Sequence, residues 1–189
     1  MSELQWHAEP RTDRPLVVLA FRGMFDAAGA ATAAVEFLRE RAPSTRLASI
    51  DPELLYDFTQ ERPSVRVLPS GRREIVWPEN EFHALRFDSR RDLVVCSGVE
   101  PHLRWRTFGE HILAVARRCG AEMVVTLGAM VGVVPHTRPL PVTGSSTNAV
   151  LARRLGLGSP SYEGPTGVIG TLHDLLDQAG VPVISLRVA

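Results

Sequence analysis

Residues 16–21 read Leu-Val-Val-Leu-Ala-Phe, six apolar residues without a polar interruption. A short continuous apolar run bounded by turn residues is typical of a strand that is buried on both faces of a sheet. Arg22-Gly23-Met24-Phe25 then predicts a turn, and Asp26 is expected to cap a helix over residues 27–41. Residues 47–50 predict a second strand, which would complete a βαβ unit with a right-handed crossover.

The same alternation returns in the second half of the chain. Further strands are predicted at 93–96, 123–127 and 183–188, and further helices at about 104–118, 148–155 and 167–179. A long loop rich in Gly and Pro separates two of these elements, over residues 128–146. Alternating strands and helices predict an α/β fold with three layers, α/β/α, around a mostly parallel sheet.

The middle of the chain has a different pattern. Residues 65–68 and 74–77 flank Pro69-Ser70-Gly71-Arg72, which predicts a β-hairpin, and residues 81–87 predict another antiparallel strand. An inserted meander of this kind is expected to form an edge, a lid or an interface. The polar residues 1–14 are expected to be a flexible tail, so that 15–189 form a single domain.

Composition excludes several functional classes. Acidic and basic residues balance at 21 each, so we expect neither nucleic acid nor a membrane surface as a partner. All the basic residues are Arg, and without Lys there is no Schiff-base lysine, pyridoxal-phosphate anchor or Walker A loop. No apolar stretch approaches the ~20 residues that cross a bilayer. The start of the chain lacks the apolar core of a signal peptide, so we expect a cytoplasmic protein.

The usual patterns of catalytic and metal sites are also missing. The six histidines have no paired spacing and lie apart from the two cysteines in the sequence, so no metal and no other cofactor is expected. Cys96 lies within a predicted buried strand, where thiols are usually inert, and no G-x-S-x-G turn precedes a helix. We therefore assign no catalytic residue. Whether the chain is an enzyme stays open, with the balance towards a non-enzyme.

Candidate binding residues follow the predicted strands, because open α/β sheets bind ligands at the carboxyl ends of their strands. Arginines at the start of the second helix and in the long loop can clamp an anion, but surface ion pairs with Glu100 or Glu110 are the favoured explanation. A carboxylate, an imidazole and a guanidinium from these loops can also bind and cleave a polar anionic substrate. The candidates for a ligand or a partner are Gly23, Asp26, Glu100, Arg104, Arg106, His136, Arg138, Thr143, Glu163 and Thr166.

Several aromatic residues fall in or beside predicted loops or at the ends of elements. Exposed rings at such places serve as anchors in protein interfaces, and core packing is the alternative for each of them. The residues are Tyr56, Phe58, Trp77, Trp105 and Tyr162.

An ordered set of short motifs spans nearly the whole chain after Leu16. It comprises Asp51-Pro52-Glu53, Tyr56-Asp57-Phe58, Arg62-Pro63, Trp77-Pro78, Gly98-Val99-Glu100-Pro101, Arg104-Trp105-Arg106-Thr107-Phe108, Thr126-Leu127-Gly128-Ala129, residues 134–139, residues 141–144 and residues 162–167. The set resembles the proteasome assembly chaperone family (PAC2 family) in its actinobacterial type.

The resemblance implies a phosphorylase-like three-layer fold and a non-catalytic, protein-binding function. Eukaryotic members hold α-type subunits during proteasome assembly, so the implied partners are proteins, with proteasome subunits among the candidates. The resemblance to bacterial members implies a homo-oligomer, and a trimer is the leading expectation. The alternative function is that of a small-molecule binder, or of a phosphorylase-like or hydrolase-like enzyme that uses the crevice at the strand ends.

Overall fold

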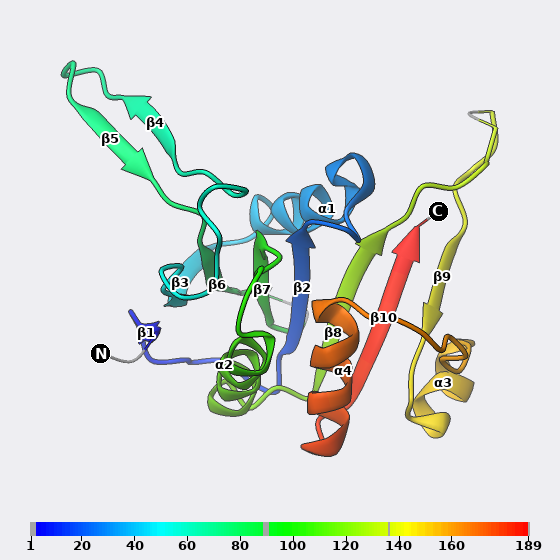
Figure 1. Ribbon diagram of the computed structural model, residues 1–189. Helices are drawn as coiled ribbons and strands as arrows, with labels where there is room; N and C mark the ends of the chain where they lie inside the picture. The colour runs from blue at the N-terminus through cyan, green and yellow to red at the C-terminus, as the bar shows by residue number, and fades with distance from the viewer. Residues whose placement is uncertain (1–2, 89–90, 136, 189) are drawn as a thin grey trace.

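A computed structural model describes residues 3–88, 91–135 and 137–188 (Figure 1). Eight strands form one sheet in the order β1-β3-β6-β7-β2-β8-β10-β9. The four central strands are parallel: β7 (Leu93–Val99), β2 (Leu16–Arg22), β8 (Met123–Ala129) and β10 (Val183–Val188). The flanking strands pair in antiparallel fashion: β1 (Leu4–Trp6), β3 (Ser44–Ile50), β6 (Asn80–Leu85) and β9 (Val142–Ser145).

Helices form a layer on each face of the sheet, which confirms the predicted α/β/α arrangement. In Figure 1, α2 (Trp105–Arg118) and α4 (Val168–Gln178) lie in front of the sheet and α1 (Ala30–Arg39) lies behind it. The short helix α3 (Ala149–Leu155) lies beside the β9 edge. Among the described residues no helix is long and apolar enough to span a bilayer.

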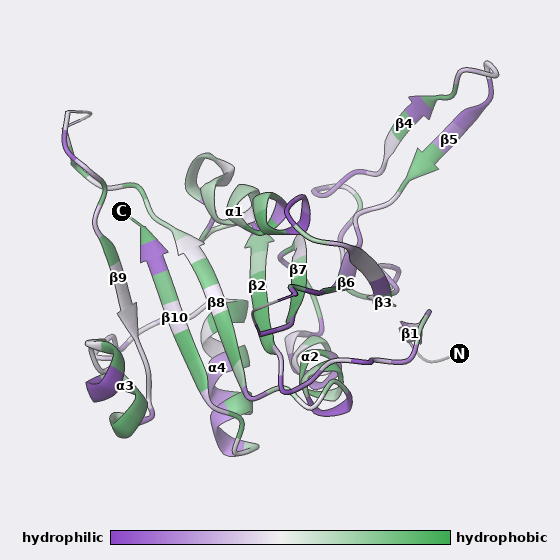
Figure 2. Ribbon diagram, turned by 180° about the vertical axis from the view of Figure 1, so that it is seen from behind, coloured by the Kyte–Doolittle hydropathy of each residue, from purple (hydrophilic) through white to green (hydrophobic). Residues whose placement is uncertain are grey.

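The apolar run in β2 explains why this strand is central. Val17, Leu19 and Phe21 are buried in one cluster with residues of α2 and α4, whereas Val18 and Ala20 are buried in a second cluster with residues of α1. A strand with two buried faces gains about 1.5–3 kcal/mol from each large apolar side chain that leaves water. Figure 2 shows the same property as predominantly hydrophobic colouring along the central strands.

The start of α1 is fixed by Asp26. Its carboxylate accepts hydrogen bonds from the backbone N–H groups of Ala31 (2.8 Å) and Thr32 (3.2 Å), so the predicted capping role is confirmed. The α-helix begins at Ala30, three residues later than predicted. A short 3₁₀ turn, η1 (Ala27–Gly29), precedes it, and the positive φ values of Ala28 (56°) and Gly29 (70°) separate this turn from the α-helix.

The predicted βαβ unit is present: β3 runs in the same direction as β2 in the same sheet, and β6 and β7 lie between the two strands. The expectation for the meander is wrong. β6 lies inside the sheet and does not extend the hairpin, because Phe82 and Ala84 are buried on one face and Leu85 on the other. The hairpin itself, β4 (Ser64–Val67) and β5 (Arg73–Val76), forms a separate two-stranded sheet. We call residues 64–76 the arm.

The N-terminal segment also differs from the expected flexible tail. β1 pairs with the outer edge of β3, and Leu4 is buried in the main core. The guanidinium of Arg118 lies 4.2 Å from the centre of the Trp6 ring, and the carboxylate of Glu3 contacts Nε2 of His111 at 3.0 Å. Leu4 and Trp6 alternate with polar residues, which suits a strand that covers an open sheet edge.

His173 of α4 is mostly buried against β8. Its Nε2 lies 2.8 Å from Oγ1 of Thr126, and burial, together with the charge of Arg187, lowers the pKa of His173 to about 4. An unfolded chain restores an ordinary imidazole with a pKa near 6.5. The folded protein therefore excludes a proton that the unfolded chain takes up between these two values.

We expect the free energy of unfolding to fall as the pH drops from about 6.5 to about 4, by up to roughly 3 kcal/mol from this group. Above that pH window His173 is neutral in both the folded and the unfolded state, so it does not change the free energy of unfolding with pH. Urea denaturation at a series of pH values should show the loss in the wild type and a flatter profile in His173→Gln. Identical profiles for the two proteins would contradict the assignment.

Candidate functional site

A cavity of about 520 Å³ lies where β2 and β7 end. Three segments form its walls. They are residues 22–24 after β2, residues 57–61 after β3, and residues 99–105 between β7 and α2. This is the carboxyl edge of the parallel strands, where open α/β sheets bind their ligands.

A buried hydrogen-bond network joins these walls. The side-chain oxygen of Asn80 accepts the backbone N–H of Val99 (2.8 Å), and its Nδ2 donates to the carbonyl of Val99 (3.2 Å). The hydroxyl of Tyr56 donates to the same carbonyl (2.7 Å) and accepts a hydrogen bond from Asn80. Burial raises the pKa of Tyr56 well above its usual range, so the phenol keeps the proton that it donates.

Gly98 makes this network possible. A Cβ at this position would lie 1.7 Å from Oδ1 of Asn80, closer than any non-bonded contact allows. The absence of a side chain at residue 98 therefore lets the Asn80 amide replace a neighbouring peptide group at the end of β7. This accounts for the glycine of the Gly98-Val99-Glu100-Pro101 motif.

Backbone contacts fix the segment after β3 against the segment after β7. The N–H groups of His102 and Leu103 both donate to the carbonyl of Leu55, at 2.9 and 3.0 Å. The N–H of Asp57 donates to Nδ1 of His102 (3.2 Å), so in a neutral imidazole the proton resides on Nε2. The cavity walls are thus held by hydrogen bonds and do not depend on a ligand.

Carboxylates dominate the charge of the cavity. Hydrogen bonds from the hydroxyl and N–H of Thr59 and from the side chain of Gln60 lower the pKa of Asp57 to about 2. Glu100 accepts the N–H of Met24 (2.9 Å), and Glu61 pairs with Arg22. Within the described residues neither Asp57 nor Glu100 has a cationic partner in an ion pair. The negative lining disfavours the anionic substrate that the sequence suggested.

The structure brings together two of the predicted site residues, Gly23 and Glu100. A Cβ at Gly23 would lie 2.3 Å from Oε2 of Glu100. Residue 23 therefore has to lack a side chain if Glu100 is to keep this position. Gly167, next to Thr166, also approaches Glu100, with a Cβ position 3.3 Å from Oε1. Thr166 itself is exposed and lies outside the cavity lining.

The other predicted site residues lie elsewhere. Asp26 is occupied in capping α1, and Arg104 pairs with Glu3 of the N-terminal segment, so neither is available for an anion clamp. His136 lies outside the described residues. Exposed positions away from the cavity are occupied by Arg106, Arg138, Thr143 and Glu163.

Sequence reasoning missed the segment that follows β3. Asp57 and Glu61 line the cavity, together with His102 and Trp105. The rule that sites form at the carboxyl ends of parallel strands also applies to β3, which is parallel to β2 as the predicted βαβ unit requires, but Asp57 and Glu61 lie several residues beyond its end. Asn80 had no recognisable signal, because its role depends on the pairing of β6 with β7.

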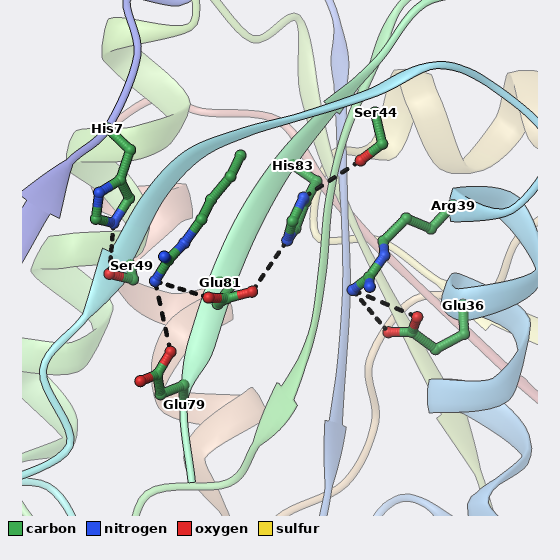
Figure 3. Close-up of polar contacts among 9 residues, drawn as sticks. His7, Glu36, Arg39, Ser44, Ser49, Glu79, Glu81 and His83 are labelled. Carbon is green, nitrogen blue, oxygen red and sulfur yellow. Dashed lines mark hydrogen bonds and ion pairs between the residues drawn. The ribbon is translucent and has the colours of Figure 1, made fainter. Parts of the chain in front are cut away.

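A second polar group lies beside α1 on β3 and β6 (Figure 3). Arg46 pairs with Glu81 (2.7 Å) and with Glu79 (3.5 Å), and Nε2 of His83 contacts Glu81 at 3.2 Å. Burial, together with the neighbouring Glu81, raises the pKa of Glu79. His7 contacts Ser49 at 2.8 Å nearby. Arg46 thus lies between two carboxylates on a partly solvated sheet face, where ion pairs contribute little to stability.

Comparison with known proteins assigns the family. The model of the PAC2 family matches residues 20–189. The chain belongs to the PAC2 family. The resemblance inferred from the motifs is thereby confirmed. No curated protein matches the chain.

Solved structures of PAC2 relatives have the same fold. A PAC2 family protein from Streptomyces avermitilis is 43% identical, with a TM-score of 0.87 over 93% of this chain and 75% of that one. A proteasome-assembly chaperone homologue from Mycobacterium tuberculosis is 39% identical, with a TM-score of 0.78 over 92% and 74%. An archaeal proteasome activator from Pyrococcus furiosus, 17% identical with a TM-score of 0.71 over 100% and 80%, shares the fold.

We expect Gly98→Ala to lower the free energy of unfolding by about 2 to 3 kcal/mol, because the added methyl group must displace Asn80 from Val99. Gly158→Ala is the matched control, since a Cβ there would lie 3.6 Å from its nearest neighbour, the carbonyl oxygen of Gly144. Urea denaturation of both variants checks this. Equal stabilities would show that the Asn80 network does not constrain residue 98.

Proposed function

We propose that this PAC2 protein is a non-catalytic, protein-binding module that assists assembly or activity of the proteasome or of another complex. The proposed partners are proteins, with proteasome subunits the first candidates. The M. tuberculosis relative, 39% identical, is described as a proteasome-assembly chaperone homologue, which supports this choice. The proposal also includes association of several copies, with a trimer as the leading stoichiometry, and a cytoplasmic location.

The proposal rests on apolar surface on two projections beyond the strand ends, the arm on the β3 side of the sheet and a second segment on the β9 side (Figure 1). In the arm, Val65 pairs with Ile75, and Val67 shares their face; all three are exposed. Isolated two-stranded hairpins are marginally stable in water, so an apolar face on one is expected to gain a partner.

The second projection lies between β8 and β9. Val131 and Val133 are 94% and 105% exposed, and Leu140 and Val142 follow on the return to the sheet. Soluble monomers rarely expose several neighbouring apolar side chains without a binding role. This segment offers a protein partner apolar contacts that the folded chain itself leaves unused.

The cavity supports an alternative, a small-molecule site, through its size of about 520 Å³. Its described lining contains no cysteine, serine or threonine that can act as a nucleophile. The two cysteines are buried, and burial raises the pKa of Cys96 above its usual range and that of Cys119 to about 11. Both thiols therefore stay protonated at neutral pH, which favours the binding module.

We expect the purified protein to bind proteasome α-type subunits of its source organism, and Val131→Ser/Val133→Ser to weaken that binding about tenfold or more. Val150→Ser, on α3 and 70% exposed, is the matched control and should bind like the wild type. Surface plasmon resonance with immobilised subunits measures all three. Absence of binding by the wild type would refute the proteasome assignment, and unchanged binding by the double variant would refute the surface.

A further inference from the structure

The arm carries two arginines without partners at its far end. Arg66 pairs with Glu74 across the hairpin, whereas Arg72 and Arg73 make no ion pair with any residue that the structure describes. Arg73 lies opposite Val67 in the hairpin register, so it shares the apolar face. The tip of the arm is therefore both cationic and apolar.

The cavity has the complementary properties. Asp57 and Glu100 lack cationic partners in the described part of the chain, and the charge of Glu61 is compensated by Arg22. Two apolar side chains, Met24 and Leu103, line the same cavity and are 70% and 52% exposed. The indole of Trp105 forms another part of the wall. The cavity thus offers two carboxylates beside apolar surface.

The charge asymmetry extends beyond these pairs. Residues 51–61, which lead into the cavity wall, contain four carboxylates and no basic residue. The arm that follows contains three arginines and one glutamate. The two surfaces are therefore opposite in charge and complementary to each other.

The arm cannot satisfy the cavity of its own chain. Both views of the ribbon show it projecting away from the sheet, with its tip far from the ends of β2 and β7 (Figures 1 and 2). An arm guanidinium that pairs with Asp57 or Glu100 must therefore belong to a different molecule. The arm of a second copy carries both such guanidinium groups and apolar side chains that can cover the exposed rim of the cavity.

We propose that the arm of one copy docks in the cavity of a second copy, with Arg72 and Arg73 pairing with Asp57 and Glu100. Arginine–carboxylate pairs are short and directional, and apolar contact between Val67 and Met24 or Leu103 excludes water around them. The contact rests on the self-association included in the proposed function and names its surfaces. Because it joins two different surfaces, it is head-to-tail, and such contacts close into rings when the rotation permits.

Sedimentation velocity of the wild type should show a single assembly larger than a monomer, weakened by salt. Arg72→Glu/Arg73→Glu should dissociate it, raising the dissociation constant about tenfold or more. Arg153→Glu/Arg154→Glu, which makes the same charge change on exposed α3 residues, is the control and should assemble like the wild type. A monomeric wild type, or an arm variant that assembles like the control, would overturn the proposal.

A mixing experiment tests the head-to-tail geometry itself. Asp57→Asn/Glu100→Gln removes both charges and keeps one acceptor oxygen at each residue, for the N–H groups of Thr59 and Met24, while the hydrogen bond from Gln60 to Asp57 is lost. The variant should therefore fold but should no longer bind the arm. Each double variant alone should be a monomer. A mixture of the arm variant and the cavity variant should form a one-to-one complex, because each retains the half that the other has lost. Failure to form this complex would overturn the contact.

Binding to proteasome α-type subunits is read separately with the same proteins. A monomer that binds the subunits would refute the arm–cavity contact and the association of several copies, and would leave the protein-binding function intact. An arm-dependent assembly that binds no subunit would support the arm–cavity contact and refute the proteasome assignment.

Discussion

The hydrogen bonds between the Asn80 side chain and the backbone of Val99 are the constraint on which the rest of the site depends. The backbone pairing of β6 with β7 reaches only to Val95, and the Asn80 side chain supplies a donor and an acceptor to Val99 at the end of β7. Tyr56 joins the same carbonyl from the segment after β3. One buried amide therefore connects the sheet to two of the three walls of the cavity.

The central part of the fold could be predicted because its signals are local. A run such as residues 16–21 has no alternative to burial on both faces, and Asp26 before an alanine-rich segment is a local cap. The position of β3 could not be predicted, because sequence order does not reveal that β6 and β7 lie between β2 and β3. Leu4 and Trp6 lie in a segment that is otherwise polar, so the sequence did not indicate a strand there. They pack against the protein because β1 pairs with the outer edge of β3.

The site was predictable to the same extent. Gly23 and Glu100 follow the two central strands directly, and the rule for strand ends placed them correctly. Asp57 and Glu61 follow β3, which is parallel to β2 as predicted, but they lie beyond the first residues after the strand, and no local pattern marks them. Of the two explanations for Arg104, the surface ion pair is correct, although its partner is Glu3 of the N-terminal segment. The residues that were missed depend on loops and on contacts between distant segments.

The chain combines a preformed acidic cavity, a cationic arm and an apolar segment before β9, and these features suit recognition of proteins better than catalysis. Residues 55–57 and 99–103 are fixed to one another without any ligand. Native-state hydrogen exchange of the backbone amides of Val99, His102 and Leu103 tests this most directly. We expect exchange as slow as that of Val95 in the core of β7. Exchange as fast as that of exposed Val131 would show that the cavity walls are not held by the Asn80 network.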